Sequence, residues 1–247
     1  MIDRIRRGVA AGAVAGAAYG LFTWLVLSPA VGYLEHAASH GAGHGGGGHG
    51  HAQEAARAVS EATTALVSAG GGVLWGVLLG AAFGAAYYLF EPALPGGDAK
   101  AYVLAGAGFL AVSVAPWTVL PPVVPGMEQL YGPGVRVPLY LGLIGVGALV
   151  AAASVLAYDR ASAARGRRVG AVAAVLPLVA LALLSALAPP TLTGGEAPAE
   201  LAVAFRWLVA LSQAGLWALI AVGFRRFERV GDRRAADSPA STPTGTD

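Results

Sequence analysis

PLYLGLIGVGALVAAASVLAYDRASAARGRRVGAVAAVLPLVALALLSAL, residues 138–187, decides the fold class. Two apolar runs without a charged residue, 138–158 and 169–187, flank a short segment that contains four arginines. A bilayer core of roughly 30 Å is crossed by about 20 apolar residues in a helix, and each run has about this length. The stretch therefore predicts two membrane-spanning helices joined by a basic turn.

Four further apolar runs extend this pattern over the rest of the chain. They cover residues 8–27, 74–90, 101–120 and 203–224. Of the 247 residues 56% are hydrophobic and only 12% are charged, whereas a soluble domain has about a quarter charged residues. We therefore expect an all-α, polytopic transmembrane helix bundle of about six spans. It forms a single domain over residues 1–230, and the Ser-, Thr- and Pro-rich tail 231–247 is expected to be disordered.

The basic residues predict the orientation of the bundle. Thirteen of the 16 Lys and Arg residues flank the spans on one side, and this is the side that contains both termini. The positive-inside rule predicts a multi-pass protein of the cell membrane with both termini in the cytoplasm. Because the basic residues form short clusters between apolar runs, the pI of about 9.1 indicates topology signals in contact with the lipid bilayer, and no nucleic-acid partner is expected.

Glycines recur at every fourth position in the first two spans. Gly8, Gly12, Gly16 and Gly20 share one helical stripe, and Gly76, Gly80 and Gly84 form a second. Such stripes allow two helix backbones to approach each other closely. Tight helix packing is the simpler interpretation, and an ion path lined by these glycines is the alternative.

All five histidines lie between the first and second spans, in a Gly-rich external loop expected at about 32–62. The candidate metal ligands in this loop are His36, His40, His44, His49, His51 and Glu35. Neutral imidazole binds divalent ions such as cobalt, nickel and zinc, and a glycine tether lets the ligands converge at an entropic cost. The pattern predicts metal contact in this loop. The alternative is a solvated low-complexity loop in which histidine has no special task.

A proline-rich segment follows the third span: APWTVLPPVVPGMEQLYGPGVRVPLYLGL, residues 115–143. Proline lacks the backbone N–H and obstructs the preceding helical turn. Broken backbone at membrane depth needs surrounding protein or water, and its freed carbonyls are natural cation ligands. Glu128 is therefore a further candidate metal ligand, on a path for the ion. Alternatively, the prolines only shape a surface loop and Glu128 faces water.

Arg206 lies just inside the last span, where a charge is expensive and is usually paired. Two partners are open for it: Glu128 across the bundle, or the external interface, toward which its side chain could snorkel. The chain lacks a Gly-Lys-Ser or Gly-Lys-Thr phosphate loop, an HExxH pair and a GxSxG elbow. We therefore expect neither an enzyme nor a permanently bound cofactor.

The chain resembles the CbtA-type cobalt transporter subunits. The resemblance rests on the His-rich loop after the first span, on FLAVSVAPWTVLPPVVPGM at 109–127, on RVPLYLGL at 136–143 and on APAELAVAFRWL at 197–208. It implies a divalent-cation uptake permease linked to cobalamin metabolism, with cobalt as the expected transported ion and a small single-span partner subunit beside it.

Two other function classes stay open on the residues alone. One is a non-transporting membrane scaffold or assembly subunit whose loop only buffers metal. The other, more remote, is a membrane enzyme that acts on a lipid or polyprenyl substrate. Such an enzyme needs acidic or histidine residues clustered at the interface, and only Glu128 and the His-rich loop come near this requirement.

Overall fold

The computed structural model describes residues 1–39, 51–125, 127–188, 190–192 and 199–236. Within these residues the chain is helical, without β-strands, and six helices are long and apolar enough to cross a membrane. This confirms the all-α, six-span prediction. The spans cover Ile2–Leu34, Gly70–Ala93, Gly97–Trp117, Pro133–Arg165, Arg167–Ala186 and Ala199–Gly231.

Eight α-helices, with short 3₁₀ and π-helical stretches, build these spans. The first span runs through α1 (Ile2–Phe22), the π-helical η1 (Thr23–Leu27) and α2 (Ser28–Ser39). The second is the last part of α3 (His51–Phe90), which continues into η2 (Glu91–Ala93). After η3 (Gly97–Ala99), the third span comprises α4 (Lys100–Phe109), the π-helical η4 (Leu110–Val114) and α5 (Ala115–Trp117). The last three spans are α6 (Pro133–Arg165), α7 (Arg167–Ala186) and α8 (Ala199–Ala236).

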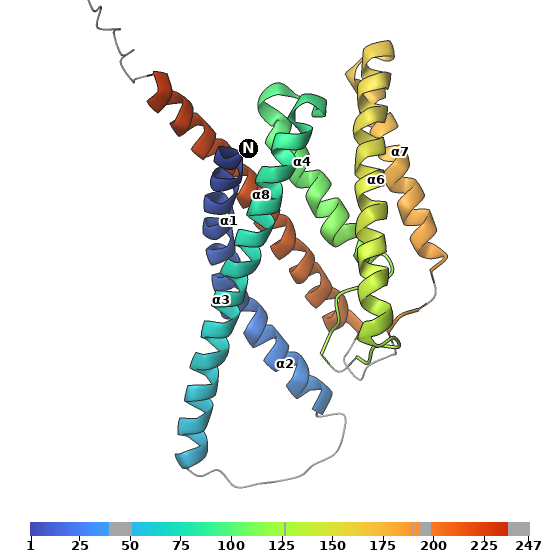
Figure 1. The fold of residues 1–247 in the computed structure, drawn as a ribbon. Helices are drawn as coiled ribbons and strands as arrows, with labels where there is room; N and C mark the ends of the chain where they lie inside the picture. The colour runs from blue at the N-terminus through green and yellow to red at the C-terminus, as the bar shows by residue number, and fades with distance from the viewer. Residues whose placement is uncertain (40–50, 126, 189, 193–198, 237–247) are drawn as a thin grey trace, which may run out of the picture.

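The helices form two groups (Figure 1). In the first group α1 packs between α3 and α8, and α4 packs on α8. In the second group, α6 and α7 form an antiparallel hairpin, and α6 packs against the third span at η4 and α5. The start of α1, the C-terminal end of α8, the α3–α4 connection and the α6–α7 turn lie at one end of the bundle (Figure 1). The proline-rich segment lies at the opposite end.

The glycine stripes pack α1 directly against α3. A Cβ atom built on Gly16 lies 2.6 Å from the carbonyl oxygen of Gly72, which leaves no room for a side chain. Cβ atoms on Gly12 and Gly76 would likewise meet the backbone of the other helix. The prediction of tight packing is confirmed for these two helices. In α6, by contrast, Cβ atoms on Gly142 and Gly145 have open space around them.

The best-buried apolar core lies in the first group, toward the end that contains the termini. The rings of Phe83, Tyr87 and Phe224 contact one another, with centroids 4.8–6.4 Å apart. Trp217 of α8 packs over Gly108 of α4, where a Cβ atom would collide with its ring. Large apolar side chains of α6 and α7, such as Leu149 and Leu176, remain exposed, as expected of surfaces that face lipid.

Two π-helical turns interrupt the first and third spans, each ending two residues before a proline. Pro29 follows η1, and Pro116 follows η4. A proline removes one hydrogen-bond donor and its ring pushes against the preceding turn, which a wider π turn accommodates. The two spans thus widen at corresponding places for the same reason.

The structure extends helices into segments that the sequence left irregular. Within the loop expected at about 32–62, the backbone is helical up to Ser39 and again from His51. Of the tail expected at 231–247, residues up to Ala236 continue α8. The remaining parts of both segments, 40–50 and 237–247, lie outside the described residues.

Candidate functional site at the end opposite the termini

The break in the third span is built by its prolines. Helix α5 ends at Trp117, and the Thr118 hydroxyl donates a hydrogen bond to the Ala115 carbonyl at 2.7 Å. The Leu120 N–H still reaches the Pro116 carbonyl at 2.7 Å. The backbone has no regular structure from Pro121 to Val124, because three of the five residues 121–125 are prolines. This stretch offers more hydrogen-bond acceptors than donors.

The broken segment is anchored in protein at one residue, while the residues beside it are half-buried. Val124, at its centre, is fully buried, and it packs against Leu34 of α2 and Ala202 of α8. The first span, the proline-rich segment and the last span therefore meet at one point. Residues 35 and 36 directly follow Leu34, so the start of the His-rich segment emerges beside this junction.

Hydroxyl groups from distant parts of the chain donate hydrogen bonds to one carbonyl in the third span and to one just after its end. Tyr140 of α6 donates a hydrogen bond to the Val112 carbonyl at 2.7 Å. That carbonyl lies four residues before Pro116, which has no N–H to offer it. Thr191 donates to the Val119 carbonyl, also at 2.7 Å, and its own carbonyl accepts from the Leu130 N–H at 3.1 Å. These bonds join the α6–α7 hairpin to the break.

Arg206 projects from α8 into the same region. Its guanidinium Nη2 lies 3.5 Å from the sulfur of Met127, and its Nε is buried without a hydrogen-bond partner among the described residues. Its side chain lines two open hollows of about 300 and 290 Å³. The first also contains Trp117 and Trp207, and the second contains Met127 and Thr191. Arg206 thus lies beside the segment that contains Glu128.

The candidate metal ligands are distributed over three places. Glu35 and His36 lie in the last turns of α2, and His51 is the first residue of α3. Helices α2 and α3 diverge from each other toward this end (Figure 1). His40, His44 and His49 lie outside the described residues. Glu128 is exposed on the proline-rich segment.

A metal centre is not assembled in the part of the chain that the structure describes. Among those residues no group of three His, Asp or Glu side chains lies close enough to hold one ion. The metal-ligand assignments therefore remain predictions.

Tyr140 and Thr191 are the functional residues that sequence reasoning missed. A tyrosine hydroxyl inside an apolar span must find a partner, so Tyr140 carried a signal, although nothing in its surroundings identified Val112. Thr191, in a Pro- and Gly-rich connection, carried none. Gln213 of α8, which donates to the Tyr19 hydroxyl of α1 at 3.0 Å, is a similar polar link between spans.

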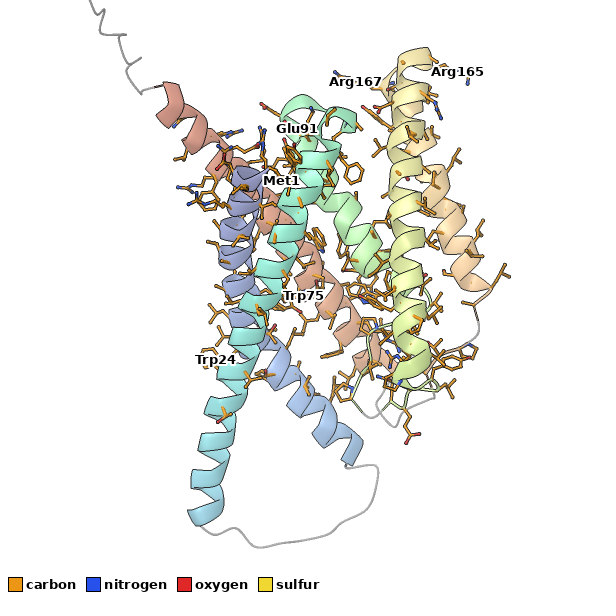
Figure 2. All side chains as sticks on the ribbon, viewed as in Figure 1. Met1, Trp24, Trp75, Glu91, Arg165 and Arg167 are labelled. Carbon is orange, nitrogen blue, oxygen red and sulfur yellow. The ribbon has the colours of Figure 1, made fainter. Side chains whose placement is uncertain are left out.

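The opposite end of the bundle is held by ion pairs. Arg4 of α1 pairs with Glu91 at 3.2 Å and with the buried Glu228 of α8. Arg225 of α8 pairs with Asp98 at 2.8 Å. Figure 2 shows Met1, Glu91, Arg165 and Arg167 at this one end. The predicted gathering of basic residues on a single side is thus present in the structure.

Comparison with known proteins identifies a family. The family model described as "Probable cobalt transporter subunit (CbtA)" matches residues 2–228, nearly the whole chain. No curated protein and no solved structure matches.

Proposed function

The chain belongs to the CbtA family of probable cobalt transporter subunits, and from this premise we propose that it is the membrane subunit of a cobalt uptake system linked to cobalamin metabolism. The family match over residues 2–228 is the observation that carries the proposal. Cobalt is the transported ion, and the chain needs no permanently bound cofactor. Because members of this family are described as transporter subunits, we propose a partner protein, and we expect it to be small with a single span.

In this proposal the His-rich segment captures the ion outside the cell. His36, His40, His44, His49 and His51, with Glu35, supply imidazole and carboxylate ligands that suit Co²⁺. The junction at Val124 supports this role, because Leu34 packs there and the His-rich segment begins directly after it. An ion released from the first histidines is then close to Glu128 and the proline-rich segment.

The proline-rich segment forms the next part of the path. It is packed into protein at Val124 and is rich in acceptors, and Glu128 adds an exposed carboxylate a few residues further on. The guanidinium of Arg206 repels a cation that enters either of the two hollows that this side chain lines, because like charges repel. The passage of Co²⁺ therefore requires this guanidinium to move away or to be neutralised by a carboxylate.

The test is uptake of radiolabelled cobalt by cells that lack their own cobalt importers. Cells receive the chain alone, the chain with its candidate partner, or a variant in which all five histidines are changed to alanine. A matched control changes Ala37, Ala42 and Ala52 to glutamine, so that the same segment is altered while every imidazole stays.

Loss of the histidines should raise the cobalt concentration for half-maximal uptake, and the control should not. Unchanged uptake by the histidine variant removes the capture role. No uptake from any combination, with the protein shown to be in the membrane, contradicts cobalt transport.

A second function is favoured by a specific observation: one carbonyl in the broken span and one just after its end already accept hydrogen bonds from hydroxyls within the chain. Val112 and Val119 bind Tyr140 and Thr191, and the glycine stripes of α1 and α3 pack against each other. Both features suit a non-transporting scaffold or assembly subunit whose loop buffers metal. That function predicts cobalt binding by the purified chain without cobalt flux into proteoliposomes, whether or not the partner is present.

A further inference from the structure

A hollow with a strongly basic wall lies between α4 and α8, at the end of the bundle that contains the termini. Its volume is about 440 Å³. Four arginines of α8 line it, together with Tyr102 of α4: Arg225, Arg226, Arg229 and Arg233. None of the residues that line it is acidic. The hollow thus presents four guanidinium groups to a single ligand.

The arginines form a stripe because of their spacing along α8. Arg225, Arg226, Arg229 and Arg233 follow Val222 at three, four, seven and eleven residues, so that they share one helical face with it. Glu228 is on the inner face, where it pairs with Arg4. The buried carboxylate therefore holds the helix against α1, while the basic stripe faces outward.

Arg225 of the stripe forms ion pairs with acidic residues. It pairs with Asp98 at 2.8 Å, and its other terminal nitrogen lies 3.9 Å from Glu228. Its Nε is buried and has no hydrogen-bond partner among the described residues. The Asp98 carboxylate is 93% exposed, so an incoming anion competes with a weakly held partner.

Apolar side chains share the wall of the hollow with the arginines: Val230 lies among them, and Val222 lies at the end nearer the middle of the span. Val222 lies one turn before Arg226, on the side of the bilayer interior, and is 49% exposed. Tyr102, also 49% exposed, faces it from α4. Both helices belong to predicted spans that end or begin near this level, at Gly231 and Gly97. A ligand that fits has an anionic head at the arginines and an apolar part along Val222.

We infer that this hollow binds the headgroup of an anionic phospholipid, such as phosphatidylglycerol. Arginine forks bind phosphate oxygens in pairs, and basic pockets between spans at the cytoplasmic side suit phospholipid headgroups. A soluble anion shares the phosphate chemistry but gains nothing from the exposed Val222 and Tyr102. The site is independent of the metal path, because it lies at the opposite end of the bundle.

The experiment compares two triple variants of the full-length chain. The test variant is Arg226→Gln, Arg229→Gln and Arg233→Gln, whose side chains are exposed and which keeps Arg225 and its ion pairs. The matched control is Arg165→Gln, Arg167→Gln and Arg168→Gln, which removes the same charge from exposed positions at the same end, in the α6–α7 turn.

Native mass spectrometry then counts lipid retained after extraction from vesicles of phosphatidylglycerol and phosphatidylcholine. We expect the wild type to retain phosphatidylglycerol, the test variant to lose it about tenfold, and the control to keep it. Phosphatidylglycerol, unlike phosphatidylcholine or inorganic phosphate, should also raise the thermal midpoint of the wild type.

Each other result overturns the inference. If both variants lose the same amount of phosphatidylglycerol, exposed basic residues attract this lipid in general and the hollow is not a specific site. Equal retention of phosphatidylcholine means an apolar site without headgroup recognition. Complete displacement of phosphatidylglycerol by inorganic phosphate would mean that the site binds soluble anions. If the test variant fails to fold, Asp98→Asn serves instead, because it releases Arg225: retention must then rise, and unchanged retention contradicts the site.

Discussion

Single hydroxyl groups complete the backbone hydrogen bonding that proline disrupts in this protein. The Val112 carbonyl is at membrane depth, and the donor it lost to Pro116 is replaced by Tyr140, 28 residues away in the chain. Lipid cannot supply such a donor, so the partner has to come from another span. Tyr140 therefore contributes to stability through one defined bond.

Tyr140→Phe should destabilise the protein by about 0.5–2 kcal/mol, because the Val112 carbonyl then stays buried without this partner. The measurement is the thermal midpoint of the purified protein in detergent. Tyr88→Phe is the control, since Tyr88 lies 47% exposed on α3 and should give no change. Equal midpoints for wild type and Tyr140→Phe would mean that water or another group serves the carbonyl equally well.

Arg206 places a positive charge beside the proline-rich segment. Under the transport proposal, Arg206→Gln should lower the cobalt concentration for half-maximal uptake by about threefold to tenfold. The reason is that removal of one positive charge weakens the repulsion of Co²⁺ in the hollow. Arg206→Lys keeps the charge and should leave this concentration close to the wild-type value. A loss of uptake in both variants would instead make Arg206 a structural residue for the Met127 segment.

At the scale of the elements, the spans pair in two different ways. Helices α1 and α3 approach through glycines, so that backbone meets backbone. The α6–α7 hairpin instead packs against the third span at η4, the π-helical turn that precedes Pro116. The glycine contact excludes any ion path between α1 and α3, and leaves the proline-rich segment as the candidate.

Gly12→Val should separate α1 from α3, because the new side chain meets the Gly76 carbonyl and rigid backbone cannot yield. Overpacking of this kind costs about 1–3 kcal/mol, seen as a lower thermal midpoint. Gly142→Val makes the same substitution on α6, where nothing lies within 4 Å, and should be tolerated. A similar fall in both variants would point to helix propensity and not to the close approach.

At the scale of the whole molecule, the two ends are built by different chemistry. Ion pairs among Arg4, Glu91, Glu228 and Arg225 connect α1, η2 and α8 at the basic end. Prolines and hydroxyl-to-carbonyl bonds shape the opposite end. Charged side chains hold the helices together at the first end, whereas at the second end hydroxyl groups donate to backbone carbonyls beside the prolines.

The orientation of these ends in the cell is a prediction that the chain is well suited to test, because it has no cysteine. Single variants Gln129→Cys and Ala164→Cys place a thiol at exposed positions of opposite ends. A maleimide that cannot cross membranes should label Gln129→Cys on intact cells and Ala164→Cys only after permeabilisation. The reverse pattern would contradict the positive-inside assignment and place the His-rich segment in the cytoplasm.

The six spans and the segment that contains the break follow from the sequence alone, and the glycine repeats predict tight packing without identifying the partner helix. Length and hydropathy identify a span, a four-residue repeat identifies a stripe, and several prolines close together end a helix, because each depends on neighbouring residues. A single proline does not suffice, since Pro138 lies inside α6 and Pro177 inside α7. The prolines at 116, 121 and 122 indicated the break, although not the π turn that precedes it.

Only the tertiary structure decided what surrounds the break. Val124 meets Leu34 and Ala202, Thr191 reaches Val119 from 72 residues away, and Arg206 lies against Met127. The sequence had left Glu128 or the interface as partners for Arg206, and the basic hollow between α4 and α8 had no sequence signal beyond a charge cluster. These contacts join residues on different helices, and their pairing depends on how the helices cross, which local sequence does not encode.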